Sequence, residues 1–132
     1  MMRLREYQVR AMETCLPSCD NFAYMMLNLV GEVGELAGKV AKAIRKEQMT
    51  IGSAYLTEMN QLCDSLYDDT KLSSAEYKAL DDDLKSEAGD ILWQLAGLCN
   101  AMGWDLADVA ECNLAKLAAR KNTGTIITHK DH

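Results

Sequence analysis

Residues 21–46 most constrain the fold of this chain, because their apolar side chains recur with the period of a helix. Steps of four and three residues connect Met26, Val30, Val33, Ala37, Val40 and Ile44. Such steps place side chains on one stripe of an α-helix, which an amphipathic helix turns toward a core. The whole sequence has a single proline, Pro17, so long helices meet no other proline block.

Composition extends this prediction to the rest of the chain. The 132 residues are 48% hydrophobic and only 6% aromatic, a mixture that suits a helical bundle better than a sheet. This length predicts one domain over residues 1–132, large enough to bury a core. We therefore expect an all-α bundle of four to five helices.

Local signals predict where these helices begin and end. A short helix over 3–14 precedes Pro17, and Asp20 is the expected N-cap of the 21–46 helix. Ser53 can cap a third helix. Further along, the S-x-x-E capping box of Ser73 and Glu76 opens a helix that runs to Met102. The last expected helix, capped by Asp105, covers 106–121 and is followed at 122–132 by a tail rich in turn-forming residues. Gly103 suits the C-terminal end of the preceding helix.

Charge, hydropathy and cysteine content restrict the partners and the compartment. The formal charge of −6 argues against a nucleic acid polymer as partner. No apolar run reaches the roughly 20 residues of a membrane span, and the charged N-terminus lacks the apolar core of a signal peptide. We therefore expect a cytoplasmic protein with reduced thiols. Cys15 and Cys19 lack the neighbours of a metal site, whereas Cys99 and Cys112 are expected in the core.

Two pairs of acidic residues share the spacing i, i+3. Glu32 and Glu35 lie in the 21–46 helix, on the side away from the apolar stripe and beside Asn28 and Lys39. Taken alone, this pair fits the solvated face of an amphipathic helix better than it fits a functional site.

The second pair, Glu87 and Asp90, lies in a narrow polar strip with Asp83 and Gln94. Apolar or small residues flank the strip on both sides, which predicts partial burial. A buried carboxylate needs a partner, because removing its charge from water costs several kcal/mol. No Lys or Arg occurs from Ser86 through Ala115, so a metal cation or basic residues from elsewhere must supply the positive charge.

The last expected helix carries Asn113 within its apolar stripe, with Lys116 and Arg120 at the edge. These residues fit either a satisfied core amide with two snorkelling cations or a row of donors to phosphate oxygens. Four carboxylates supply the hard oxygen ligands that Mg²⁺ or Mn²⁺ prefers. Carboxylates, metal and basic row together would suit a phosphate-bearing ligand.

The chain resembles the MazG-like group of the all-α nucleoside triphosphate pyrophosphohydrolases. The resemblance covers roughly residues 4–46 and 84–126, and leaves 47–83 without a counterpart. It rests on four segments, EYQVRAMET (6–14), LNLVGEVGELAGKVAK (27–42), SEAGDILWQLAGLCNAMGWDLADVA (86–110) and NLAKLAARKNTGTI (113–126).

The resemblance implies a reaction and a set of site residues. Members of the family cleave nucleoside triphosphates between the α and β phosphates, giving a monophosphate and pyrophosphate. Carried over, the metal ligands would be Glu32, Glu35, Glu87 and Asp90, with Mg²⁺ as the ion and Mn²⁺ as an alternative. Metal would neutralise the triphosphate and activate the attacking water. The catalytic carboxylates would include Glu35 and Glu87, and the substrate contacts would be Asn113, Lys116, Arg120, Asn28 and Trp93.

Family members also assemble as homodimers or homotetramers, so the resemblance implies a site between helices that a neighbouring copy completes. Gln94 stands where an aromatic residue is expected, which leaves the contacts to base and sugar open. The competing function is a non-catalytic helical bundle that senses a nucleotide or binds a partner. A di-iron bundle would need Glu-x-x-His pairs, and the only histidines are His129 and His132 in the tail.

Overall fold

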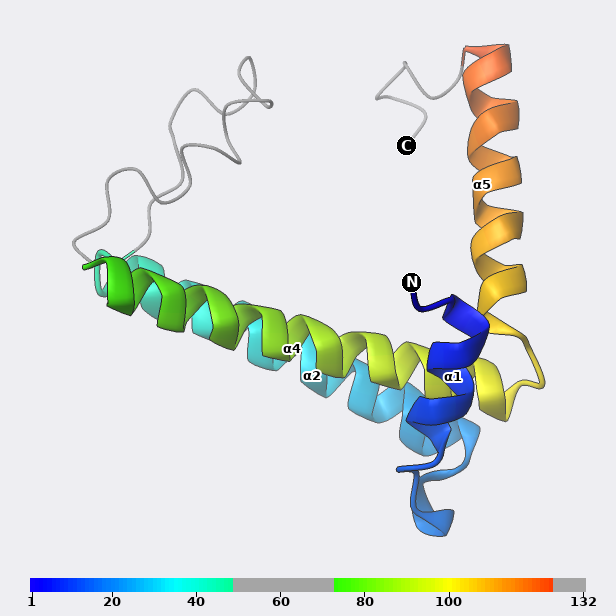
Figure 1. The fold of residues 1–132 in the computed structure, drawn as a ribbon, viewed down its shortest axis with the longest axis horizontal. Coiled ribbons are helices and arrows are strands. Elements are labelled where there is room, and N and C mark those ends of the chain that lie inside the picture. Colours follow the sequence, from blue (N-terminus) through cyan, green and yellow to red (C-terminus); the bar gives the residue numbers. More distant parts are fainter. Residues whose placement is uncertain (49–72, 125–132) are drawn as a thin grey trace. The chain divides into compact units, whose positions relative to one another are not determined.

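The computed structural model describes residues 1–48 and 73–124, and these ranges form helices joined by short turns and irregular segments (Figure 1). In order they form α1 (Leu4–Met12), a 3₁₀ turn η1 (Pro17–Cys19), α2 (Phe22–Arg45), α4 (Ser74–Ala101) and α5 (Leu106–Thr123). The described ranges contain no strand, which confirms the all-α prediction. The helix expected after Ser53 falls outside the described residues.

Three of the helix-end predictions are confirmed, two by hydrogen bonds and one by a backbone dihedral angle. At the start of α4, the N–H of Glu76 donates to Ser73 Oγ at 3.2 Å, and the N–H of Ser73 donates to Glu76 Oε1 at 3.4 Å. At the start of α5, the N–H of Ala107 donates to Asp105 Oδ1 at 2.9 Å. Gly103, just after α4, has a positive φ of 74°, a conformation that glycine adopts without a steric penalty.

The predicted N-cap of α2 is wrong by one residue. The N–H of Tyr24 donates to Asn21 Oδ1 at 2.8 Å, so Asn21 is the capping residue. Asp20 instead ends the 3₁₀ turn, and its carboxylate accepts a hydrogen bond from Asn100 Nδ2 at 3.2 Å. The Asp20 side chain, predicted from local rules to cap α2, therefore bonds a residue that is distant in sequence.

The chain divides into two compact units. One comprises Met1–Leu27 and Trp93–His132, and the other comprises Asn28–Leu92. Within the described ranges, no helix combines the length and apolarity that a bilayer crossing requires.

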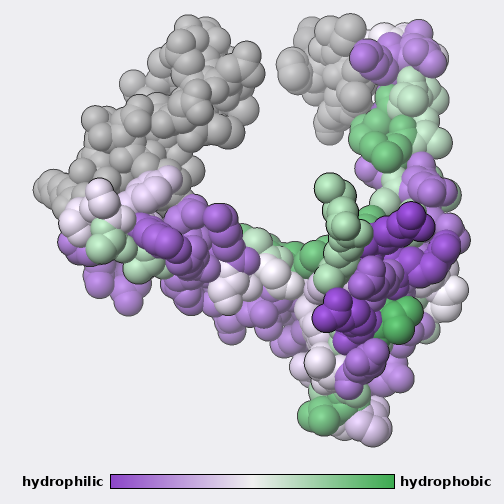
Figure 2. Space-filling view, in the orientation of Figure 1, coloured by the Kyte–Doolittle hydropathy of each residue, from purple (hydrophilic) through white to green (hydrophobic). Residues whose placement is uncertain are grey.

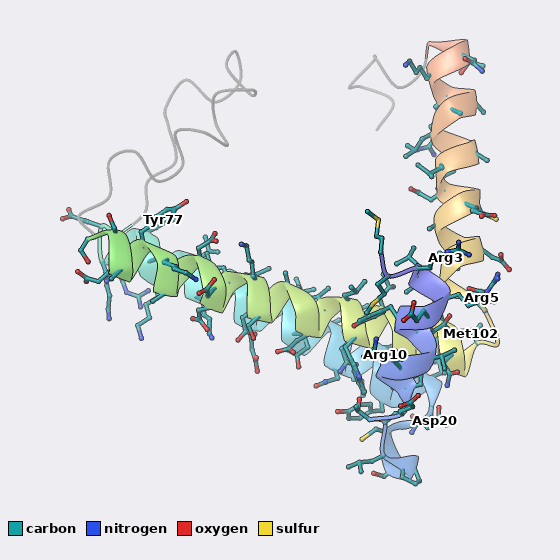
Figure 3. The ribbon with its side chains drawn as sticks, in the orientation of Figure 1. Arg3, Arg5, Arg10, Asp20, Tyr77 and Met102 are labelled. Carbon is teal, nitrogen blue, oxygen red and sulfur yellow. The ribbon has the colours of Figure 1, made fainter. Side chains whose placement is uncertain are left out.

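The first unit is built around Ala96, Cys99 and Leu106, with Tyr7 and Met12 of α1 packed against them. Gln8 is buried, and both ends of its side-chain amide form hydrogen bonds. The nitrogen donates to the Trp104 carbonyl at 2.9 Å, and the oxygen accepts from the Leu106 N–H at 2.8 Å. Arg5, labelled on α1 in Figure 3, pairs with Asp105 at the start of α5. Polar contacts thus fasten α1 to the turn between α4 and α5.

The four described cysteines are free thiols. Cys99 is buried, as expected, and burial raises the pKa of its thiol. Cys112 is exposed, and the prediction that it lies in the core is wrong. It lies on the side of α5 that also carries the exposed Asn113 and Lys116.

The second unit pairs the later part of α2 with the earlier part of α4. Lys39 contacts Asp83 and Glu87, whereas Glu32, earlier in α2, approaches Glu87 and Asp90, later in α4. Because the numbering rises on one helix as it falls on the other, the two helices run antiparallel (Figure 1). The N-terminal half of α4 presents mainly hydrophilic residues in Figure 2.

The apolar stripe predicted for the second helix lies largely on the surface, so that part of the prediction is wrong. Val30 is 69% exposed and Val33 is 47% exposed. The less exposed row of α2 runs instead along Met25, Leu29, Glu32, Leu36, Lys39, Val40 and Ala43. Both rows have helical spacing, and periodicity alone does not say which row another helix will cover.

Candidate metal centre

Three carboxylates of the second unit converge between α2 and α4. Glu32 comes from α2, and Glu87 and Asp90 come from α4, where their i, i+3 spacing places them on one side of the helix. One oxygen from each lies within 4.8 Å of the others. The structure therefore brings together three of the four predicted metal ligands.

The two glutamates share a pattern of one engaged oxygen and one unpartnered oxygen. Glu32 Oε1 accepts from Asn28 Nδ2 at 3.5 Å, and Glu87 Oε1 is 2.7 Å from Lys39 Nζ. Oε2 of each glutamate is buried and has no hydrogen-bond partner in the described part of the chain. A buried charged oxygen without a partner is costly, so these two atoms call for a cation.

Lys39 is the basic residue from elsewhere that the acidic strip of α4 requires. Its ammonium lies 2.7 Å from both Asp83 Oδ1 and Glu87 Oε1. The two hydrogen bonds, that with Asp83 first, raise the pKa of Lys39 far above its ordinary value, so it remains charged. The sequence carried a signal for this contact, since Lys39 follows Glu32 by seven residues and therefore shares its side of the helix.

The remaining electrostatics of the cluster are repulsive. Burial raises the pKa of the Glu32 carboxyl above its ordinary value, and the nearby charges of Glu35, Asp90 and Glu87 raise it further. The hydrogen bond from Asn28 acts in the opposite direction but is the smallest contribution. A bound cation would offset this repulsion, because it stabilises the ionised carboxylates.

The donor set fits a hard divalent cation. Carboxylate oxygens are the ligands that Mg²⁺ and Mn²⁺ prefer, and the unpartnered oxygens of Glu32 and Glu87 are available to bind one. Glu35, predicted as a fourth ligand and as a catalytic carboxylate, is exposed and is not one of the three clustered residues. It follows Glu32 by one turn of α2.

The predicted substrate contacts are divided between the two units. Asn28 belongs to the second unit and holds Glu32, as described above. Asn113, Lys116 and Arg120 lie along one side of α5 in the first unit, where their spacing places them in one row. Trp93 also belongs to the first unit, and its indole N–H donates to Thr14 Oγ1 at 2.9 Å and to the Ala11 carbonyl at 3.1 Å.

Asn113 and Lys116 line an open cavity of about 580 Å³ along α5. Trp104, which sequence reasoning did not single out, lines it as well and is 49% exposed. Asp105, Asp108, Val109 and Cys112 form other parts of the wall. The cavity therefore combines an aromatic ring with an amide and an ammonium group.

Comparison with known proteins identifies the family of this chain. The sequence pattern of the MazG nucleotide pyrophosphohydrolase domain matches residues 21–125, which include all three clustered carboxylates. The chain is also 31% identical to the Gene 37 protein of Mycobacterium phage L5 over 132 residues, covering 95% of this chain and 94% of the phage protein. No solved structure matches it. The chain therefore belongs to the MazG nucleotide pyrophosphohydrolase family.

Proposed function

We propose that this protein is a Mg²⁺-dependent nucleoside triphosphate pyrophosphohydrolase that cleaves ribo- or deoxyribonucleoside triphosphates between the α and β phosphates. The products are the nucleoside monophosphate and pyrophosphate. The observation that carries the proposal is the pair of buried, unpartnered oxygens on Glu32 and Glu87, which lie beside Asp90. Buried polar atoms in folded proteins are nearly always partnered, and a bound cation would partner both oxygens.

Glu32, Glu87 and Asp90 are the residues that would hold the ion. A divalent cation bound there supplies positive charge to the phosphates and lowers the pKa of water. Glu35 is exposed one turn along α2, which leaves its carboxylate available to accept the proton of the attacking water. Water would contribute its oxygen to one phosphorus of the α–β bridge and its proton to Glu35, the P–O bond from that phosphorus to the bridging oxygen would break, and the monophosphate and pyrophosphate would separate.

The residues of α5 are the proposed contacts to the phosphates and the nucleoside. Lys116 would bind phosphate as a point charge, and Asn113 beside it would orient the nucleotide. Arg120, in the same row, would extend the positive charge along the helix. Trp93 would act through less of its surface, because its indole N–H already has protein acceptors, whereas Asn28 has only one contact, from its amide nitrogen to Glu32. Only the ring face of Trp93 remains for a base.

Self-association as a homodimer or homotetramer would cover the exposed apolar row of α2. Val30 and Val33 are about half to two-thirds exposed, and further along the same helix Ile44 is 39% exposed. Contiguous apolar surface of this kind marks association sites in soluble proteins. Light scattering on the purified protein tests this expectation, and a purely monomeric, fully active protein would contradict it.

Product analysis tests the enzymatic proposal. The protein is incubated with a panel of ribo- and deoxyribonucleoside triphosphates, with and without Mg²⁺, beside Glu87→Gln and the control Glu13→Gln. Glu13 is an exposed glutamate outside the metal centre, so its variant controls for the loss of one negative charge. Monophosphate and pyrophosphate from wild type and Glu13→Gln, lost without metal and in Glu87→Gln, are the expected result. Tight nucleotide binding without turnover would instead support the non-catalytic sensor.

A further inference from the structure

The ammonium group of Lys39 lies between the carboxylates of Asp83 and Glu87. Asp83 and Glu87 are one turn apart on α4, and the Lys39 ammonium on α2 is 2.7 Å from one oxygen of each. Two carboxylates at this spacing make a ligand pair for a metal ion. Here the chain fills that position with its own positive charge.

The same contact engages only one of the two carboxylate oxygens of Glu87. Oε1 is held by Lys39, and Oε2 is buried without a partner in the described residues. A carboxylate can bridge two cations with its two oxygens, as happens at two-metal sites. At Glu87, one of those two cations is an ammonium group.

We propose that Lys39 is a built-in second cation of the metal centre, and that the chain alone therefore holds a single divalent ion. Lys39 acts as a positioning residue, because it acts through Glu87 and has no assigned contact with the substrate. Any further ion that the reaction uses would arrive with the triphosphate. The inference rests on the proposed function in one respect, the assignment of Glu32, Glu87 and Asp90 as ligands.

The test counts Mn²⁺ ions bound to the full chain in the absence of nucleotide, by calorimetry and by the electron paramagnetic resonance signal of free Mn²⁺. Lys39→Met removes the bridging ammonium and keeps an unbranched side chain of similar length. Lys42→Met is the matched control, because it removes an exposed positive charge from the same helix one turn away. Circular dichroism confirms that each variant retains its helices.

We expect one ion in wild type and Lys42→Met, and two in Lys39→Met over the same concentration range. The double variant Lys39→Met/Asp83→Asn should return to one ion, because the second site has lost a ligand. Lys39→Arg should also hold one, since guanidinium can bridge two carboxylates.

Two ions in wild type would overturn the proposal, whether or not Lys39→Met folds. One ion in a folded Lys39→Met would overturn it as well. No Mn²⁺ bound to wild type would instead contradict the metal centre and with it the proposed function. The two failures are therefore distinguishable.

Discussion

Lys39 holds one oxygen of Glu87 at 2.7 Å and leaves the other oxygen of the same carboxylate buried without a partner in the described part of the chain. The contact joins α2 to α4 and orients Glu87 at the same time. Asn28 has a comparable relation to Glu32, at the longer distance of 3.5 Å. In each pair a donor from α2 engages one carboxylate oxygen, so contacts within the protein orient both glutamates.

Divalent metal should stabilise the fold through these carboxylates. A ligand that binds only the native state at 100 times its dissociation constant adds about 2.7 kcal/mol to the free energy of unfolding. We expect Mg²⁺ and Mn²⁺ to raise the thermal midpoint of wild type, and Glu87→Gln to lose most of that increase. Differential scanning fluorimetry checks this, and an equal rise in both proteins would place the ion elsewhere.

Replacing Glu32 by Gln should stabilise the metal-free protein at neutral pH while removing activity. The pKa of Glu32 is raised in the folded state by burial and by neighbouring negative charge. Folding therefore favours the protonated form, and the associated stability, present below the unfolded pKa of about 4.3, is lost as pH rises through the folded pKa. Urea unfolding in EDTA should show that Glu32→Gln has a higher free energy of unfolding than wild type at pH 7 but not at pH 4. A variant that is less stable than wild type at pH 7 would contradict this.

The Arg5–Asp105 pair should make stability fall at acid pH. The hydrogen bond from Arg5, followed by that from the Ala107 N–H, holds the pKa of Asp105 below its ordinary value. The stability from this ionisation is present above the unfolded pKa of about 3.9 and is lost as pH falls through the lower folded pKa.

Asp105→Asn removes the negative charge but keeps the N-cap of α5, because Asn caps helices about as well as Asp. We expect it to unfold at lower urea concentration than wild type at pH 7 and at a similar concentration near pH 2. Asp108→Asn is the control, since Asp108 lies 3.8 Å from Arg5 and is well exposed. An equal decrease in stability in the two variants would contradict a specific contribution from the Arg5–Asp105 pair.

Gly97→Ala should destabilise the first unit. A Cβ at Gly97 would overlap the thioether of Met25, which is fully buried and has little room to move. Overpacking of this kind costs about 1–3 kcal/mol, whereas Ala gains about 1 kcal/mol over Gly in a helix. Gly89→Ala, on the same helix with open space around it, should be neutral or stabilised by up to about 1 kcal/mol. Chemical denaturation of both variants provides the comparison.

Trp93→Phe should lower stability without changing the apparent affinity for nucleotide. It removes the indole N–H that bonds Thr14 and Ala11, at a cost of about 0.5–1.5 kcal/mol, but keeps an aromatic ring face. Trp93→Leu removes the ring as well, and should raise KM if that face contacts a base. Steady-state kinetics on the two variants separates the two roles. A KM unchanged in Trp93→Leu would make Trp93 structural only.

The helical class, most helix ends and the acidic pairs could be predicted from local sequence. These follow from interactions within a few residues of the chain, such as the Ser73–Glu76 box, the Asp105 cap and the turn at Gly103. The i, i+3 spacing of Glu87 and Asp90 likewise places both on one side of a helix, whatever packs against it.

The side of α2 that meets α4 could not be predicted in the same way, because it depends on long-range packing. Both rows of α2 have helical spacing, and local rules favoured the row with Val30 and Val33, which is exposed. The register of two antiparallel helices is a long-range property, and that register places Lys39 against Glu87 and draws Glu32 toward Asp90. Asp20 shows the same dependence at a helix end, because a contact with Asn100, distant in the chain, replaced the capping role that its neighbours predicted.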